Sequence, residues 1–141
     1  QKATVFTAQE MNRFARLYTA KAAIECMENG EIVLLAGGTG NPYFTTDTTA
    51  ALRACEIGAE TILKATQVDG ICDSDPRTNP DAQKFDEISY LDVLAKELNV
   101  MDSTATSLCK DNNIPIIVFN LHKQGNIDRV LRGEHVGTIV S

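Results

Sequence analysis

Short apolar runs alternate along this chain with longer segments that carry helical periodicity or helix-capping residues. The runs with the length and β-branched content of strands are residues 3–7, 32–36, 61–66, 115–119 and 136–140. The segments predicted to be helical are 17–27, 48–57, 89–98, 102–112 and 125–131. Strands that alternate with helices predict an α/β fold, with a mainly parallel sheet flanked by helices.

Residues 32–66 contain a strand, a glycine-rich loop, a helix and a second strand in that order. We expect the two strands to form a parallel βαβ unit with a right-handed connection. Thr45, Thr46 and Asp47 are each suitable N-caps for the helix, and Gly58 suits its end.

The loop after the first of these strands has the composition of an anion site. Its glycines, Gly37, Gly38 and Gly40, permit backbone conformations that a Cβ atom would forbid. Exposed N–H groups and the positive end of the following helix favour a phosphate or carboxylate there. The loop matches neither G-x-x-x-x-G-K-[ST] nor G-x-G-x-x-G, so neither of those binding modes applies. An ordinary strand-to-helix turn that needs glycine for its geometry is the alternative.

A second candidate region is the irregular, acidic stretch 68–81, which holds two prolines and four aspartates. Loops at the carboxyl ends of parallel strands are where open α/β sheets bind ligands. Long loops without secondary structure are uncommon in compact domains, which favours a functional role. A solvated connection is the alternative.

Composition narrows the class of partner. The chain has 141 residues, enough for one domain, and 43% of them are hydrophobic. Its net charge of −6 predicts no nucleic-acid partner, and the chain has no apolar run of about 20 residues that would predict a membrane span. The four cysteines form no C-x-x-C pair and no zinc-ligand spacing with His122 or His135, so we expect free thiols in a reducing cytoplasm.

Several segments together resemble one family. Residues 37–53, GGTGNPYFTTDTTAALR, closely resemble the uridylate-binding segment of the bacterial UMP kinases, which belong to the amino acid kinase family. Residues 63–76, LKATQVDGICDSDP, resemble the ATP-binding segment of the same enzymes. Further similar motifs follow in the expected order at 96–105, 111–115, 118–120 and 133–140. The resemblance implies that residues 1–141 are a single domain, the C-terminal portion of an amino acid kinase-like fold.

The resemblance also implies an activity. The expected reaction transfers the γ-phosphoryl group of ATP to UMP with Mg²⁺, giving UDP in pyrimidine nucleotide synthesis. The implied assembly is a cytoplasmic homohexamer with GTP and UTP as effectors. The family's N-terminal strand, with its lysine and Ser-Gly pair, and the glycine loop that follows have no counterpart in this sequence, so we expect the chain alone to be inactive.

The family motifs assign roles to individual residues. Asp47 is the expected catalytic residue, orienting lysines. The expected UMP contacts are Thr39, Gly40, Asn41, Pro42, Tyr43, Phe44, Thr45 and Thr46, and the expected ATP contacts are Thr66, Cys72 and Asp75. No protein ligand to a metal is assigned. The family often has a lysine and an aromatic residue where this chain has Gln67 and Cys72, so the adenine pocket departs from the family pattern.

Structural alternatives accompany these roles. Asp47 could be a plain helix cap, the two aromatic residues could pack in the core, and Asp75 could be a turn residue. Lys64 could contact phosphate or extend its head to solvent, and Asp102 could be a cap or face the active site.

Two other functions compete with UMP phosphorylation. One is an acyl-phosphate-forming amino acid kinase, such as acetylglutamate kinase or aspartokinase, although the run 41–46 favours a nucleotide. The other is a nucleotide-sensing or structural module without turnover.

Overall fold

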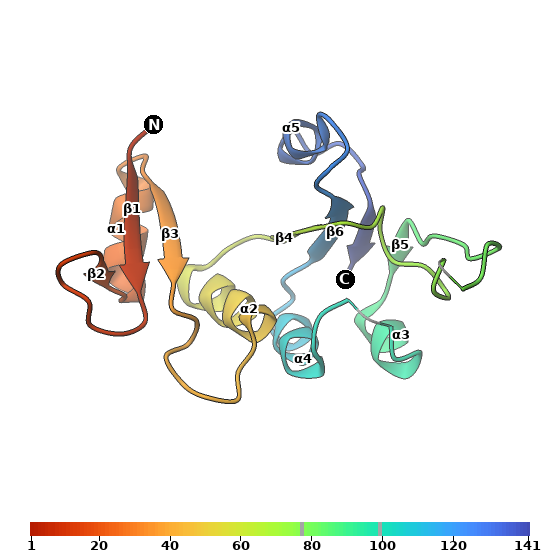
Figure 1. Ribbon diagram of the computed structural model, residues 1–141, viewed down its shortest axis with the longest axis horizontal. Helices are drawn as coiled ribbons and strands as arrows, with labels where there is room; N and C mark the ends of the chain where they lie inside the picture. The colour runs from red at the N-terminus through yellow and green to blue at the C-terminus, as the bar shows by residue number, and fades with distance from the viewer. Residues whose placement is uncertain (77, 99) are drawn as a thin grey trace.

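The polypeptide folds into two sheets joined by one helix (Figure 1). The structure, a computed structural model, describes residues 1–76, 78–98 and 100–141. In the first sheet β1 (Ala3–Thr7) lies between β2 (Arg16–Leu17) and β3 (Ile32–Ala36), and both pairings are parallel. In the second, the strand order is β4 (Ile62–Thr66), β6 (Ile116–Asn120), β7 (Thr138–Val140) and β5 (Glu87–Ile88).

Parallel pairing predominates, which confirms the predicted fold class. β4 pairs parallel to β6 and β5 parallel to β7, whereas β6 and β7 run antiparallel. The antiparallel pair is closely packed, because a Cβ atom on Gly137 would lie 1.9 Å from the carbonyl oxygen of Val118. Only glycine fits where the chain enters β7.

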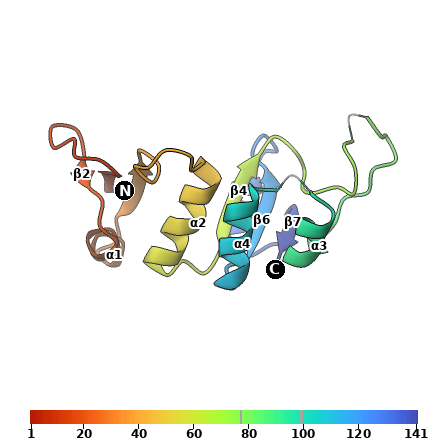
Figure 2. The same ribbon diagram turned by 90° about the horizontal axis from the view of Figure 1, so that it is seen from below.

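The prediction of a βαβ unit through residues 32–66 is wrong. β3 pairs with β1 and β4 pairs with β6, so the two strands lie at the edges of different sheets. Helix α2 (Thr46–Ile57) runs between them and packs on α4 (Ser103–Asp111) (Figure 2). Strands that follow one another in sequence are usually, but not always, neighbours in a sheet, and the local sequence does not determine which strand each of them pairs with.

Helices cover both faces of the second sheet, as the alternation of its side chains requires. Ile116 and Val118 of β6 join the main core with residues of α2, α4 and α3 (Tyr90–Ala95). Phe119, one residue on, packs instead with Val130 of α5 (Asn126–Leu131). This arrangement leaves the carboxyl ends of β4 and β6 open to the loops that follow them.

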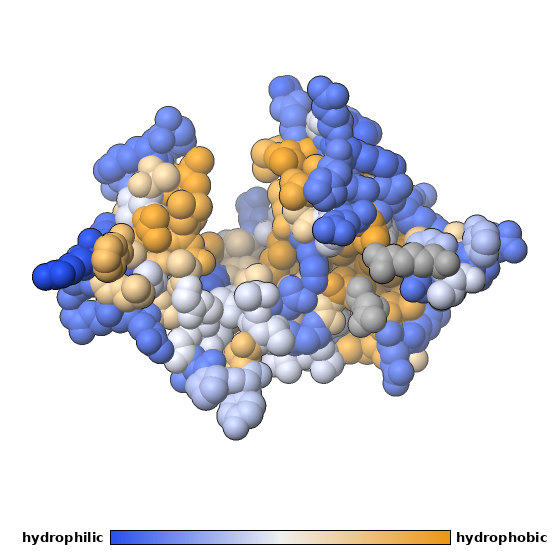
Figure 3. Space-filling model, viewed as in Figure 1, coloured by the Kyte–Doolittle hydropathy of each residue, from blue (hydrophilic) through white to orange (hydrophobic). Residues whose placement is uncertain are grey.

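The first sheet is covered on one face only. Phe6 is fully buried against Ala23 and Cys26 of α1 (Ala20–Glu28), whereas Val5 and Leu34 on the opposite face are 39% and 51% exposed. Figure 3 shows apolar side chains on both sides of the hollow between the two sheets. An apolar surface of this kind is typical of an interaction surface.

Helix boundaries differ most from the prediction at the start of α1 and at the end of α3. α1 begins after its N-cap Thr19, because Arg16 and Leu17 are drawn into β2. α3 ends at Ala95, because Glu97 adopts a left-handed φ of 50° that stops the helix before Leu98. Within the described ranges, no helix is both long and apolar enough to cross a membrane.

Candidate functional site

The glycine-rich loop leaves β3 and folds back over the end of β1. Gly37 and Gly40 both have a φ of 79°, in the left-handed region. A Cβ atom on either would lie 3.3 Å from the backbone of Ala8, so the close approach itself requires glycine. Thr39 stabilises the tip of the loop, since its hydroxyl accepts a hydrogen bond from the backbone N–H of Asn41 at 3.1 Å.

The aromatic residues of this loop point to solvent. Tyr43 is fully exposed and Phe44 is 54% exposed, so the alternative of core packing is wrong for both. Tyr43 also has a positive φ of 70°, an uncommon conformation for an aromatic residue. Such strain is retained at ligand-binding loops more often than elsewhere.

Two helix N-termini meet beside the loop and share one carboxylate. Thr45 is the N-cap of α2, and Asp102 is the N-cap of α4. The Asp102 carboxylate accepts hydrogen bonds from the hydroxyl groups of Thr45 and Thr48, and from the Ala105 N–H at 2.8 Å. Burial raises the pKa of Asp102, but these hydrogen bonds outweigh it and hold the pKa below its usual value. Asp102 is therefore both a cap and a link between the two helices.

Asp47 lies in the first turn of α2 and is paired with a lysine from the second sheet. Lys64 Nζ lies 2.7 Å from Asp47 Oδ2 and also donates to the carbonyl oxygen of Val100 at 2.6 Å. The side chains of Lys64 and Asp47 are 24% and 32% exposed. Lys64 is thus held between α2 and the segment before α4, and it does not extend freely into solvent.

An open pocket of about 1150 Å³ lies at the carboxyl ends of β4 and β6. Most of its lining comes from three segments that are distant in sequence: residues 64–76 within and after β4, 118–129 from β6 to α5, and 135–137 before β7. Lys84, Glu97, Leu98 and Val100 complete it. Thr66, Cys72 and Asp75, the expected ATP contacts, all line it, and so does Gln67. The backbone carbonyl of Asp75 accepts from the N–H groups of Thr78 and Asn79, which makes a turn there.

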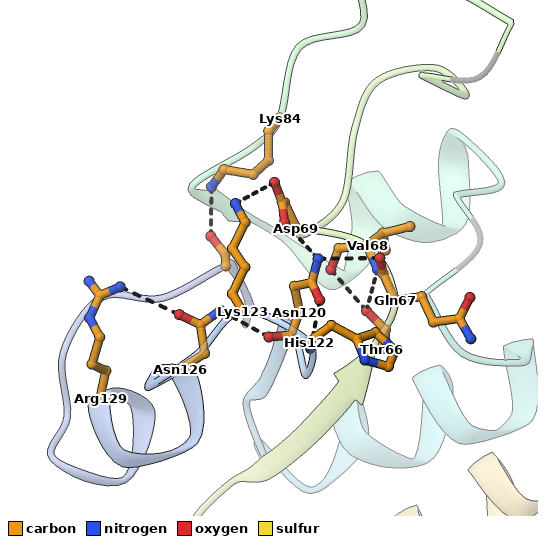
Figure 4. Close-up of polar contacts among 11 residues, drawn as sticks. Thr66, Gln67, Val68, Asp69, Lys84, Asn120, His122, Lys123, Asn126 and Arg129 are labelled. Atoms are coloured by element: carbon orange, nitrogen blue, oxygen red, sulfur yellow. Dashed lines mark hydrogen bonds and ion pairs between the residues drawn. The ribbon is translucent and has the colours of Figure 1, made fainter.

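A polar network organises the wall of this pocket (Figure 4). Asp69 accepts hydrogen bonds from Lys123 Nζ at 2.7 Å and from Asn120 Nδ2 at 2.9 Å. The hydroxyl of Thr66 donates to the carbonyl of Val68 at 3.0 Å, so the loop turns directly after β4. Asn126 donates to the carbonyl of Asn120 at 2.9 Å and fixes the start of α5 on the same wall.

Besides Lys64, three cationic side chains line the pocket in an otherwise acidic protein. They are Lys84, Lys123 and Arg129, from the loop before β5, the loop after β6 and helix α5. Hydrogen bonding to Lys123 and Asn120 holds the pKa of Asp69 below its usual value, so this carboxylate stays charged and keeps Lys123 oriented. Lys84 and Arg129 are likewise paired with carboxylates, those of Asp86 and Glu134. Lysine and arginine side chains that line a pocket can also donate charge-assisted hydrogen bonds to the phosphates of a ligand.

The expected site residues fall into two groups. Residues 39–45 lie on the loop between β3 and α2, and Thr46 is the first residue of α2. None of these residues is among the described residues that line the pocket. Asp47 and Lys64 connect the groups, because Lys64 also lines the pocket. The individual binding and catalytic roles stay predictions.

Sequence reasoning missed the pocket's charged network. Asp69, Lys84, Lys123 and Arg129 carried no assigned role, although all four line the pocket. One signal was available: β4 and β6 are parallel, so the residues that follow each strand must converge at one edge of the sheet. Applied to 67–69 and 121–123, that rule would have pointed to Asp69 and Lys123.

Comparison with known sequences gives a consistent result. A sequence model described as the amino acid kinase family matches residues 2–120. A uridylate kinase of Bacteroides thetaiotaomicron is 53% identical over 139 residues, which are 99% of this chain and 59% of that protein.

Solved structures agree in fold. A UMP kinase from Bacillus anthracis superposes with a TM-score of 0.97 at 38% identity, covering 100% of this chain and 58% of that one. A UMP kinase from Ureaplasma parvum gives 0.93 at 39% identity, with coverages of 99% and 60%. A uridylate kinase from Archaeoglobus fulgidus gives 0.68 at 33% identity, with coverages of 85% and 57%. The chain therefore spans 57–60% of the length of these relatives.

Proposed function

Because this chain belongs to the amino acid kinase family, we propose that the full-length protein transfers the γ-phosphoryl group of ATP to UMP, giving ADP and UDP. The relatives that support this substrate are called uridylate or UMP kinases and match nearly the whole chain. The chain itself would supply the UMP loop and the ATP pocket, as one domain over residues 1–141.

One observation carries the proposal: the ion pair between Asp47 and Lys64 joins the two candidate phosphate sites. The loop 37–45 ends at the N-terminus of α2, where a phosphate is favoured by the helix dipole. The pocket that Lys64 lines carries the cationic residues Lys84, Lys123 and Arg129. A donor and an acceptor phosphate bound at these places would flank the Asp47–Lys64 pair.

Phosphoryl transfer requires positioning of the two substrates and neutralisation of charge on the phosphoryl group, rather than covalent catalysis. Lys64 would place a positive charge between the two nucleotides, and Asp47 would hold its ammonium group in place. ATP would bind against Thr66, Cys72 and Asp75, with its phosphates directed to the lysines of the pocket. Thr39 to Thr46 would enclose UMP, with the exposed ring of Tyr43 or Phe44 as a cover.

Mg²⁺ would accompany ATP. It is commonly held by one or two carboxylates together with substrate phosphates, and Asp69 and Asp75 are carboxylates that line the pocket. Among the described residues, no three His, Cys, Asp or Glu side chains are grouped as metal ligands. The phosphates of ATP would therefore supply most of the ligands to the ion, and the protein would supply one or two carboxylates.

The remaining parts of the proposal rest on the resemblance to the family. They are a homohexamer, control by GTP and UTP, and a cytoplasmic location, which suits the four free cysteines. Light scattering of the full-length protein tests the assembly, and titration of GTP and UTP at fixed substrate tests the effectors.

The deciding experiment is turnover by the purified full-length protein with ATP, Mg²⁺ and UMP. We expect UDP and ADP to form in equal amounts. Acyl phosphate trapped by hydroxylamine from acetylglutamate or aspartate, with no UDP, would instead assign an amino acid kinase. A rise in melting temperature with UMP but no turnover would assign a sensing module, since a bound ligand stabilises the fold whether or not it reacts.

A further inference from the structure

Arg53 lies on α2, one turn before its end, and touches three different parts of the first half of the chain. Its Nη1 pairs with Glu56 at 2.6 Å, and its Nη2 donates to the carbonyl oxygen of Gly38 at 3.3 Å. Its guanidinium carbon lies 3.9 Å from the centre of the Tyr18 ring. The Arg53 side chain is only 11% exposed.

The partners of Arg53 are themselves fixed. The Tyr18 hydroxyl donates to Glu56 at 2.8 Å, and the Tyr18 N–H donates to the carbonyl of Thr7 at the end of β1. Burial, and then the Glu56 carboxylate, raises the pKa of Tyr18 to about 12, so the hydroxyl keeps its proton and remains a donor. Tyr18, Arg53 and Glu56 form a closed set of contacts that we call the Arg53 clamp.

The clamp acts on the glycine-rich loop through a single carbonyl. Gly38 has a φ of 64°, and a glycine in this conformation has few intrinsic restraints. The described peptide bonds are trans, and in a trans peptide the C=O and the following N–H point in opposite directions. A bond from Arg53 to the Gly38 carbonyl therefore turns the Thr39 N–H away from α2.

We propose that Arg53 is a positioning residue for the UMP site: it fixes the peptide between Gly38 and Thr39, and with it the donors of the glycine-rich loop. The inference rests on the proposed function for the identity of the ligand. The positioning itself rests on the contacts of the clamp. Only a planar, forked cation can stack on Tyr18 while donating to both Glu56 and Gly38, and lysine cannot reproduce this arrangement.

The test compares Arg53→Met and Arg53→Lys with the wild-type full-length protein. We expect Arg53→Met to raise KM for UMP by about tenfold, because a partly buried hydrogen bond from a charged group is lost. KM for ATP and kcat should change by less than about twofold, the pattern of lost ground-state binding. Arg53→Lys should keep the charge yet recover only part of the UMP affinity.

A matched control is Arg132→Met, which removes an exposed arginine from α5, where Arg132 pairs with Asp128 at 2.8 Å. It should leave both KM values unchanged. If Arg53→Met does not fold, Glu56→Gln loosens the clamp while keeping its shape, and should raise KM for UMP in the same direction. An unchanged KM for UMP in a folded variant, or equal losses for UMP and ATP, would overturn the inference.

Hydrogen exchange separates this inference from the proposed function. Peptides covering residues 37–44 should exchange faster in Arg53→Met than in wild type or Arg132→Met, whatever the substrate is. Unchanged exchange there refutes the clamp even if the protein makes UDP. Faster exchange with no UDP formation refutes the function while leaving the clamp in place.

Discussion

Asp47→Asn in the full-length protein separates a catalytic role for this residue from a structural one. The substitution removes the negative charge that lies 2.7 Å from Lys64 Nζ but keeps the size and shape of the side chain. It leaves the helix cap intact, because the N-cap of α2 is Thr45 and Asp47 lies in the first turn. The structural alternative, that Asp47 is the N-cap of α2, is therefore wrong.

The magnitude follows from the ion pair. Hydrogen bonds to charged groups contribute about 1.5–3 kcal/mol. Since the Asp47 and Lys64 side chains are about a third and a quarter exposed, solvent screening places the pair at the lower end of that range, about 1.5 kcal/mol. A loss of about 1.4 kcal/mol in the transition state slows a reaction tenfold. We therefore expect kcat to fall by at least about tenfold, with little change in the affinity for UMP.

The assay is steady-state UDP formation with ATP and UMP both saturating, together with a UMP titration and a melting curve. Asp128→Asn is the matched control, because Asp128 pairs with Arg132 on α5 and both side chains are exposed. It should retain wild-type kcat. Adding Lys64→Met completes a double-mutant cycle, in which Asp47→Asn should cost little more once Lys64 is gone.

Near wild-type kcat for Asp47→Asn would refute the catalytic reasoning and leave Asp47 a structural residue. Fully additive effects of Asp47→Asn and Lys64→Met would show that the two residues do not act as a unit. A fall in UMP affinity equal to the fall in kcat/KM would move Asp47 from transition-state to substrate binding.

Three further predictions concern the UMP loop, the pH dependence of stability and the activity of the 141-residue chain on its own. Thr45→Val with Thr46→Val should weaken UMP binding more than ATP binding in separate titrations, and should also lower stability by about 1 kcal/mol because Thr45 caps α2; equal losses for both nucleotides would contradict the UMP assignment. Asp102→Asn should reduce the loss of stability at acid pH, measured as the melting temperature at stepped pH. The pKa of Asp102 is lowered in the folded state, so its carboxylate stabilises the fold above the unfolded pKa of about 4, and this stabilisation is lost as the pH falls through the folded pKa. The 141-residue chain alone should form no UDP, because the family's N-terminal lysine and glycine loop have no counterpart in it, and turnover at the rate of the full-length protein would contradict this. The chain should also tend to associate, because β3 and β4 are edge strands and the sheet face with Val5 and Leu34 is uncovered.

Local features were predictable where the chemistry is local. Ser89 caps α3 at the start of the predicted helix 89–98, and Asp102 caps α4, one of the two roles expected for it, because a side-chain oxygen needs only the N–H groups of the next turn. The strand 32–36 was predicted with its observed bounds from its apolar run. Among three candidates for the cap of α2, the structure selects Thr45, whose hydroxyl accepts from the Thr48 N–H.

By itself, then, the sequence determined the five longer strands, most of the helix starts and the family to which the loops belong, since these depend on residues a few positions apart. The two-residue strands β2 and β5 and the start of α1 were not predicted. The tertiary structure alone decided that β3 and β4 enter different sheets, that Lys64 meets Asp47 across 17 positions, and that Asp102 meets Thr45 across 57. It also brought Asp69 within reach of Lys123, 54 positions away. The physical reason is that pairing between distant segments depends on which sheet edges and helix faces come together, and no short stretch of sequence encodes that choice.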